Sequence, residues 1–201
     1  KNISKLIYEK SGIKCPKGII IDSKNSKIQM KFPFILKPIN GGSSISVYKI
    51  TNSNQKKTVF TEYFNNYSSG LIEEYIDGRE ITVGIFDNKV CGVTEIISDS
   101  GFYDYKNKYV KVAKHIINPK LPKKIKDQLY SYSLLAHNIL GCNFISRSDF
   151  RYNPITDEVY LLEINTQPGL TQSSLIPEML SRIDIKFSDM CEQILKHSKC
   201  E

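Results

Sequence analysis

Four polar residues near one turn have types and a spacing that could hold a metal ion. Arg147 and Asp149 are two positions apart in one largely apolar stretch, and Glu163 and Asn165 are two apart in the next. Because successive side chains of a strand point to opposite faces, each pair lies on one face of its strand. If the two stretches form a hairpin centred on residue 156, just after Asn153-Pro154, Asp149 lies opposite Glu163. The same register places Arg147 opposite Asn165, so all four side chains would share one face.

This set of side chains suits phosphate chemistry. Two carboxylates and an amide oxygen are the hard oxygen ligands that Mg²⁺ takes when it also binds substrate phosphates. The guanidinium of Arg147 beside them would offset negative charge on a transferring phosphoryl group. The alternative is a solvated face with one cross-strand ion pair, worth about 1 kcal/mol or less. The spacing alone leaves both interpretations open.

A second candidate feature is a glycine- and serine-rich loop, Gly41-Gly42-Ser43-Ser44, that follows Lys37 and Pro38. Glycines let backbone N–H groups come close to phosphate oxygens, and serine hydroxyls add further donors. The stretch is not a Walker P-loop, because the pattern G-x-x-x-x-G-K-[ST] is absent. A plain surface turn explains it equally well.

Two further stretches could complete a nucleotide site. Residues 71–80 place acidic side chains between two apolar segments, where backbone groups could receive an adenine and Glu80 a ribose hydroxyl. Residues 102–109 are aromatic and cationic, and could form a lid that excludes water from a reactive intermediate. The alternatives are two strands with charged ends and a packed surface loop.

The elements that would position these residues mix strands and helices without strict alternation, which predicts an α+β fold and not a doubly wound one. Apolar periodicity predicts a short first helix with Ile3, Leu6 and Ile7, a helix from Pro122 to about Gly141, and a last helix over Ser188–Lys196. Strands are predicted over Gly18–Ile21, Phe32–Lys37, Ile45–Ile50, Leu71–Ile76, Glu80–Phe86, Val90–Ile97, Asn143–Tyr152 and Glu158–Asn165.

Composition narrows the classes of partner. The formal net charge is +7, and residues 1–60 hold 12 lysines against only Glu9 and Asp22, which suits a lobe that holds polyphosphate. No basic run has interleaved aromatic residues, which argues against a nucleic-acid partner. No apolar run approaches the roughly 20 residues that span a bilayer, and no secretory signal stands at the start, so we expect no membrane partner and a cytoplasmic protein. The five cysteines form no C-x-x-C pair, and neither they nor the three histidines predict a metal site.

Taken in order, these stretches resemble the D-alanine–D-alanine ligase family of ATP-grasp enzymes, from Lys1 to the final helix. Residues 163–177 read EINTQPGLTQSSLIP, which is similar to the family signature E-x-N-T-x-P-G-x-T-x-x-S-L-x-P. The loop after Lys37, the stretch 102–109 and Arg147-Ser148-Asp149-Phe150 match in order and spacing.

The resemblance implies an activity, cofactors and residue roles. ATP would phosphorylate the carboxylate of one D-alanine, and the amine of a second would attack the acylphosphate, giving the dipeptide for peptidoglycan precursors. Two Mg²⁺ ions, for which Mn²⁺ can substitute, would be held by Asp149, Glu163 and Asn165. The implied ATP-binding residues are Lys1, Lys37, Gly42, Ser43, Ser44, Glu73, Ile76, Glu80 and Lys108. The implied catalytic residues are Arg147, Lys108, Tyr109, Ser44, Gly169 and Ser174, with Ser174 binding the carboxylate of the second D-alanine.

The resemblance also implies an organisation. Residues 1–80 would be the central ATP-grasp subdomain and 81–201 the C-terminal subdomain with the metal and second-substrate sites, with ATP between them, in an enzyme that works as a homodimer. The sequence starts where the family's additional N-terminal domain would end. Ser46 and Phe144 stand at positions where the family usually has glycine. Two alternatives are an ATP-grasp ligase with another acceptor and a nucleotide-binding fragment that is inactive without the N-terminal domain.

Overall fold

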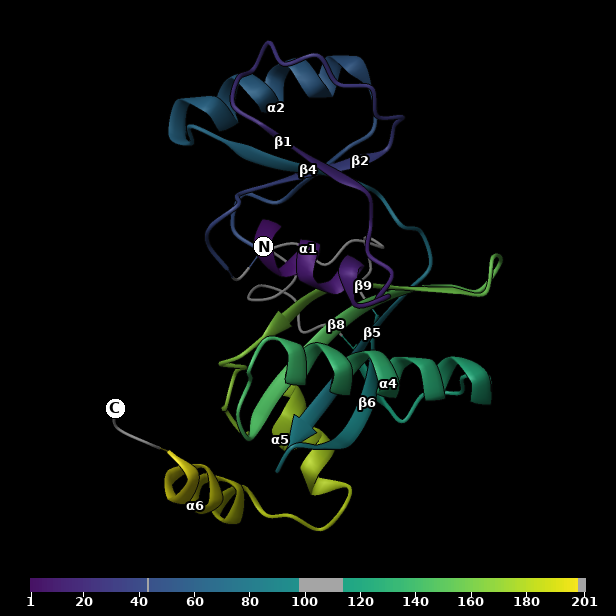
Figure 1. Cartoon of the computed structure of the whole chain (residues 1–201), viewed down its shortest axis with the longest axis vertical. Coiled ribbons are helices and arrows are strands. Elements are labelled where there is room, and N and C mark those ends of the chain that lie inside the picture. Colours follow the sequence, from purple (N-terminus) through teal and green to yellow (C-terminus); the bar gives the residue numbers. More distant parts are fainter. Residues whose placement is uncertain (43, 98–113, 199–201) are drawn as a thin grey trace. The chain divides into compact units, whose positions relative to one another are not determined.

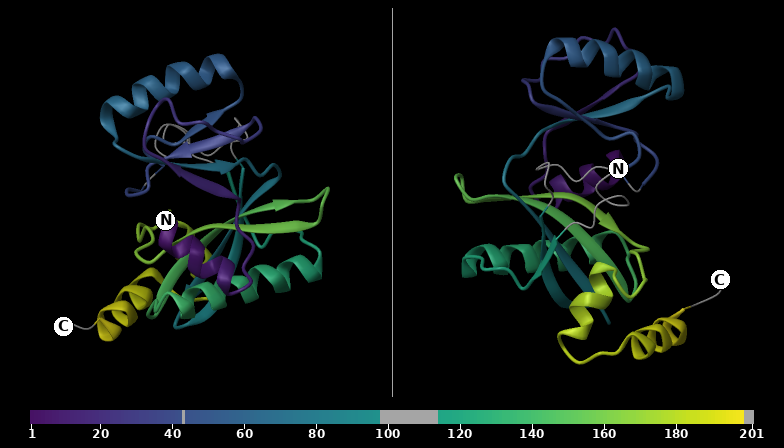
Figure 2. Two further views of the ribbon diagram at one scale, coloured as in Figure 1. Left: turned by 45° about the horizontal axis from the view of Figure 1, so that its top comes forward. Right: turned by 180° about the vertical axis from the view of Figure 1, so that it is seen from behind.

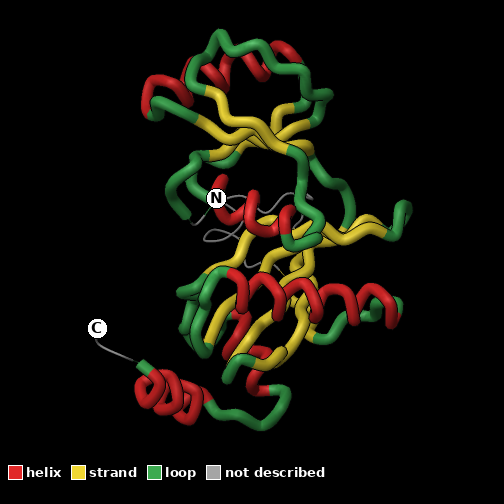
Figure 3. Tube along the Cα trace, viewed as in Figure 1, coloured by secondary structure: helices red, strands yellow, loops and turns green. Residues whose placement is uncertain are grey.

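The computed structural model describes residues 1–42, 44–97 and 114–198, which form helices and two mainly antiparallel sheets (Figures 1 and 3). The predicted α+β class is confirmed. All eight predicted strands are present, with ends shifted by three residues or fewer. The chain folds into two compact units.

The first unit is built mainly from Pro16–Ile76 around a four-stranded sheet with the order β1-β4-β2-β3. Its strands are β1 (Gly18–Ile21), β2 (Phe34–Lys37), β3 (Tyr48–Ile50) and β4 (Gly70–Glu74). Helix α2 (Ser53–Asn66) lies across one face of this sheet (Figure 1). There Phe60 and Tyr63 of α2 are buried in one cluster with Phe34, Leu36 and Ile72. The opposite face carries the residues that alternate with this core, which are Ile35, Lys37, Leu71 and Glu73.

Sequence reasoning missed helix α2, although a local signal for it exists. The side chain of Asn52 accepts hydrogen bonds from the backbone N–H groups of Asn54 and Gln55, which is the usual function of an N-cap residue. Phe60 and Tyr63 follow at the three-residue spacing of one helix face. The many polar residues between them hid the pattern.

The second unit holds Ser4–Cys15, Asp77–Ile97 and the chain from His115 onward, around a sheet with the order β7-β6-β5-β8-β9. Its strands are β5 (Arg79–Phe86), β6 (Lys89–Ile97), β7 (Lys114–Ile117), β8 (Ile145–Asn153) and β9 (Glu158–Asn165). Its helices are α1 (Asn2–Lys10), α4 (Lys123–Ile139), α5 (Leu175–Ser181) and α6 (Phe187–His197). Helix α4 covers one face of the sheet and α5 packs on the other (Figure 2). Sequence reasoning did not predict β7 or α5.

Helix α1 comes first in the sequence but belongs mostly to the second unit, which differs from the predicted division after residue 80. Tyr8 and Ile13 are buried in the same cluster as Ile81 and Phe150 of the second sheet. Of the three residues that suggested this helix, Ile3 and Leu6 are exposed and Ile7 is partly buried. After α1 the chain passes into the first unit at Pro16, and after β4 it returns to the second unit at Asp77.

Ser46 and Phe144, the two residues found at positions where glycine was expected, have backbone angles that favour glycine. The φ angle is +56° at Ser46 and +64° at Phe144, in the left-handed region. A non-glycine residue in this region has a strained backbone, and contacts of the two side chains offset the energetic cost. The hydroxyl of Ser46 accepts a hydrogen bond of 2.9 Å from Tyr67, and Phe144 is 4% exposed, with its ring centroid 4.8 Å from that of Phe86 and stacked on His197.

A buried histidine joins α4 to the sheet of the second unit. His137 is 1% exposed, with Nδ1 2.7 Å from Ser146 Oγ and Nε2 3.0 Å from Asn88 Oδ1. Burial lowers the pKa of His137 because the charged imidazolium loses its hydration. The neutral ring therefore donates from Nε2 to Asn88 and accepts at Nδ1 from the Ser146 hydroxyl.

We expect this histidine to make the protein less stable in weak acid. Since the folded state lowers the pKa of His137 below the value of 6.5 that an unfolded chain shows, the unfolded state binds the proton more readily. The contribution to the free energy of unfolding is complete above pH 6.5 and is lost as pH falls below it toward the lowered pKa of the folded state. Urea unfolding between pH 8 and 5, compared with His137→Gln, measures it. The same pH dependence in both proteins would contradict it.

Two glycines let helix α5 pack closely on the second sheet. Gly84 and Gly92 lie opposite each other on β5 and β6. A Cβ atom at Gly92 would lie 2.8 Å from the Cβ of Met179 on α5, and one at Gly84 would lie 2.8 Å from the sulfur of Met179. Real Cβ atoms do not come this close, so the glycine pair fixes the position of α5.

We therefore expect Gly92→Ala to destabilise the second unit by about 1–3 kcal/mol, because α5 must move outward. Far-UV circular dichroism during urea unfolding measures the change, since the chain has no tryptophan. Gly42→Ala is the matched control, because a Cβ there would meet nothing within 4 Å. Equal stability of the two variants would show that α5 adapts without cost.

Candidate functional site

The polar hairpin of the second unit has the predicted register. Strands β8 and β9 pair antiparallel, with Arg147 opposite Asn165 and Asp149 opposite Glu163. Beyond Asp149 a bulge shifts the pairing so that Phe150 lies opposite Leu161. The bulge leaves the four polar residues on one face, so this geometric prediction is confirmed.

Strand β5 adds Thr82 to this face, directly opposite Asp149 on β8. Thr82 is completely buried, and its hydroxyl lies 2.7 Å from Asp149 Oδ1 and 3.2 Å from the carbonyl oxygen of Ser148. Sequence reasoning did not single out Thr82, because a threonine between Ile81 and Val83 looks like an ordinary strand residue. Only the pairing of β5 with β8 reveals its contact.

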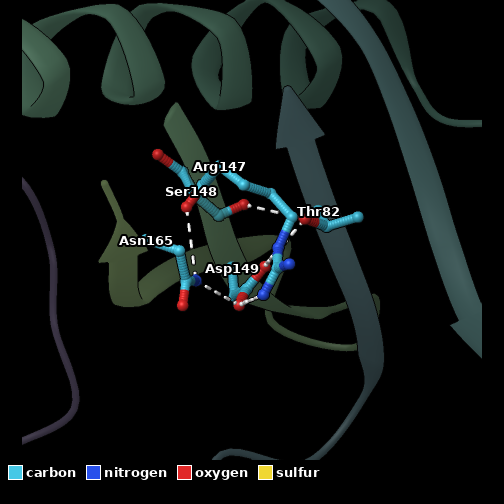
Figure 4. A network of polar contacts seen from close by, with 5 residues as sticks. All are labelled: Thr82, Arg147, Ser148, Asp149 and Asn165. Carbon is cyan, nitrogen blue, oxygen red and sulfur yellow. Dashed lines mark hydrogen bonds and ion pairs between the residues drawn. The ribbon is translucent and has the colours of Figure 1, made fainter. Parts of the chain in front are cut away.

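Arg147, Asp149 and Asn165 form one connected network with Thr82 (Figure 4). Arg147 donates from Nε to Asp149 Oδ1 and from Nη2 to Oδ2, both at 2.9 Å. Asn165 donates from Nδ2 to Asp149 Oδ2 at 2.8 Å. The side chains of Arg147 and Asp149 are 16% and 15% exposed, so the ion pair is largely shielded from water. Its charges therefore interact more strongly than those of a surface pair.

The donor set fits a magnesium ion by its chemistry. Asp149, Glu163 and Asn165 offer two carboxylates and an amide oxygen from neighbouring positions of one sheet face. Over the described residues, no cluster of three or more His, Cys, Asp or Glu side chains suits a metal ion. The predicted set does not depend on such a cluster, since its third member is an asparagine.

Further along β8 and β5, Glu80 faces Arg151. The two residues are cross-strand partners, and their side chains form an ion pair of 3.4 Å. Arg151 is 7% exposed. Glu80, the residue expected to bind ribose, lies two positions before Thr82 on β5. It therefore lies on the same sheet face as Thr82 and Asp149.

In the first unit the structure brings together two of the predicted ATP-binding residues. Lys37 at the end of β2 and Glu73 on β4 form an ion pair of 2.5 Å between Nζ and Oε2. Their side chains are 11% and 5% exposed. The pairing of β2 with β4 places them on the sheet face opposite α2. A buried ion pair of this kind needs both partners, because removing one leaves an uncompensated charge.

The glycine-rich loop is only partly described. Lys1 Nζ donates a hydrogen bond of 2.6 Å to the carbonyl oxygen of Gly41. Gly42 is exposed, and the φ angle of Ser44 is +56°. Ser43 lies outside the described residues, as do Lys108 and Tyr109 of the expected lid. Ile76 is the last residue of the first unit before β5 begins.

The loop before α5 is closed by the hydroxyl of Ser174. Ser174 Oγ accepts a hydrogen bond of 3.0 Å from the backbone N–H of Thr171 and lies 2.8 Å from Thr171 Oγ1. A Cβ atom at Gly169 would lie 2.9 Å from Ser174 Oγ. Gly169 and Ser174, both expected at the second-substrate site, are therefore neighbours in space.

Among the described helices, none is both long and apolar enough to cross a membrane.

Comparison with known proteins gives a consistent result. The family model described as "D-ala D-ala ligase C-terminus" matches residues 19–196. A D-alanine–D-alanine ligase of Pelagibacter ubique is 41% identical over 206 residues, which cover 98% of this chain and 66% of that protein. The chain spans about two thirds of the length of the curated relatives it matches.

Solved structures agree with this. The crystal structure of the D-alanine–D-alanine ligase from Bacillus anthracis complexed with ATP superposes with a TM-score of 0.80 at 28% identity, over 98% of this chain and 64% of that one. The VanG D-Ala:D-Ser ligase from Enterococcus faecalis superposes with a TM-score of 0.81 at 25% identity, over 98% of this chain and 60% of that one.

Proposed function

Because the chain belongs to the family of D-alanine–D-alanine ligase C-terminal domains and has the ATP-grasp fold, we propose that it carries the ATP-binding and metal-binding part of an ATP-dependent ligase. The ligase joins two D-alanine molecules through an acylphosphate and releases ADP and phosphate. The dipeptide serves peptidoglycan precursor synthesis in the cytoplasm, where ATP is available. The observation that carries this proposal is the shared face of Arg147, Asp149, Glu163 and Asn165 in one hairpin register.

The metal part of the proposal assigns Asp149, Glu163 and Asn165 as ligands of Mg²⁺. When bound there, Mg²⁺ neutralises charge on the phosphates. The neighbouring guanidinium of Arg147 adds positive charge on the same sheet face, where a transferring phosphoryl group needs it. Glu80 accepts a ribose hydroxyl. These groups catalyse by position and charge, because an acylphosphate carries its own leaving group.

In the first unit we assign Lys37 to the ATP phosphates, together with Lys1, Gly42, Ser43 and Ser44. Glu73 and the backbone at Ile76 receive the adenine. The ion pair between Lys37 and Glu73 supports this assignment, since it fixes both side chains on the sheet face that α2 does not cover. Lys108 and Tyr109 close over the reaction, and Gly169 and Ser174 position the second D-alanine.

The test is ADP release from MgATP with D-alanine, with L-alanine as the control. Release that depends on D-alanine establishes the ligase. MgATP binding by calorimetry without release supports the alternative of a nucleotide-binding fragment that lacks turnover. No MgATP binding contradicts the proposal.

The likeness to a D-Ala:D-Ser ligase favours a second candidate with the same chemistry and a different acceptor. The same assay with equal amounts of D-alanine and either D-serine or D-lactate distinguishes the two candidate acceptors by the product that forms. We expect D-alanine to be the better acceptor near neutral pH. A product that contains mainly D-serine or D-lactate would overturn the choice of acceptor and keep the reaction class.

A further inference from the structure

The carboxylate of Asp149 already has a full set of hydrogen-bond donors. Oδ1 accepts from Thr82 Oγ1 and Arg147 Nε, and Oδ2 accepts from Arg147 Nη2 and Asn165 Nδ2, at 2.7 to 2.9 Å (Figure 4). A carboxylate has about four lone-pair sites on its two oxygens. The four donors account for all of them. A cation can bind Asp149 only if at least one donor leaves.

The three donor residues differ in how easily they can leave. Thr82 is completely buried, and its hydroxyl is held on a strand in the middle of the sheet. Asn165 is neutral, and its amide can turn its oxygen toward a cation that Asp149 binds. Arg147 carries a positive charge, is 16% exposed and has a long side chain with several rotatable bonds. A divalent cation beside Asp149 repels this charge and weakens its attraction to the carboxylate.

We propose that Arg147 is the internal counter-ion of Asp149 in the metal-free protein, and that the guanidinium and the metal ion compete for this carboxylate. The inference rests on the proposed assignment of Asp149 as a metal ligand. Thr82 keeps its hydrogen bond in both states and so positions the carboxylate. Arg147 leaves Asp149 when the metal binds, and the guanidinium then becomes available to an anion beside the metal. The ion pair makes the binding of a phosphate group by Arg147 conditional on the metal.

The competition predicts that removing the guanidinium improves metal binding. In Arg147→Met the side chain keeps a similar length, but it carries no charge and donates no hydrogen bond. We therefore expect Mn²⁺ to bind about tenfold more tightly, equivalent to about 1.4 kcal/mol. The measurement is titration of the whole chain with Mn²⁺, following free Mn²⁺ by electron paramagnetic resonance, without nucleotide or D-alanine. Equal or weaker binding than in the wild type overturns the proposal.

Two further variants keep the test sharp. Arg147→Lys retains a charge but not the forked pair of donors, so its Mn²⁺ affinity should lie between those of the wild type and Arg147→Met. Thr82→Val should bind Mn²⁺ no more tightly than the wild type, because it removes a positioning donor and not a competing charge. Tighter binding in Thr82→Val than in Arg147→Met would contradict the role given to the guanidinium. Thermal unfolding with and without Mn²⁺ gives a second reading, with the larger stabilisation by Mn²⁺ expected in Arg147→Met.

Asp149→Asn separates a failure of this inference from a failure of the proposed function. If Asp149→Asn binds Mn²⁺ as tightly as the wild type, the ion does not bind at Asp149, and the metal assignment fails together with the competition. If binding depends on Asp149 but does not improve in Arg147→Met, only the competition fails. The titration contains no substrate, so neither result depends on ligation.

Discussion

Replacing Glu163 by glutamine should raise the dissociation constant of this chain for MgATP by about 100-fold. Changes beside a metal ligand typically cost 10- to 100-fold in metal affinity, and loss of a ligand itself should reach the upper end. Asn165→Ala should act in the same direction, because it removes the proposed amide ligand and one of the donors to Asp149. Calorimetric titration with ATP, in the presence and absence of Mg²⁺, measures both.

Glu158→Gln on the same strand is the matched control. Glu158 lies at the far end of β9, where Lys14 and Tyr160 hold its carboxylate and lower its pKa to about 2. The substitution therefore removes one carboxylate from the same strand at its far end, opposite Asn153 and away from Arg147, Asp149, Glu163 and Asn165. We expect its MgATP affinity to stay within about twofold of the wild type, since exposed ion pairs contribute little. Equal losses at Glu163, Asn165 and Glu158 would show that the metal face is misplaced.

The second large effect is expected from the buried ion pair of the first unit. Lys37→Met leaves the carboxylate of Glu73, which is 5% exposed, without its cationic partner. Breaking a buried pair in this way costs about 3–5 kcal/mol in other proteins, because one charge stays buried and uncompensated. We expect a loss of this size in the free energy of unfolding of the first unit, measured by urea unfolding with far-UV circular dichroism.

The double variant Lys37→Met with Glu73→Leu separates the structural from the functional role of this pair. Since both charges are then absent, most of the lost stability should return. Binding of MgATP should be lost in Lys37→Met and in the double variant alike, because Lys37 is the residue proposed to reach the phosphates. A double variant as unstable as Lys37→Met would show that the ion pair is not the cause. A double variant that binds MgATP normally would remove Lys37 from the site.

Features that depend on neighbours in sequence could be predicted from the sequence. The hairpin from Ile145 to Asn165 has one turn, so the alternation of side chains and one assumed register predicted Arg147 and Asp149 opposite Asn165 and Glu163, which the pairing confirms. Helix α4 likewise follows from apolar periodicity and the glycine stop at Gly141, and the last helix follows from apolar periodicity. The signature in residues 163–177 is also contiguous, which is why the family could be recognised.

Features that depend on contacts between distant segments needed the tertiary structure. The pairing of β5 with β8 brings Thr82 to Asp149 across 67 positions, and the pairing of β2 with β4 brings Lys37 to Glu73. The same holds for α1, whose Tyr8 packs against the second sheet. Local patterns show which face of a strand is polar but not which strand lies beside it.

Local patterns in the sequence therefore predicted the α+β class, eight of the described strands, the family and a candidate set of metal ligands. The contact of Arg147 with the carboxylate of Asp149, and that of Thr82 from the neighbouring strand, emerged from the folded sheet alone. Periodicity and turn chemistry act over a few residues, which explains this difference. Hydrogen bonds between distant side chains form only when the whole sheet has assembled.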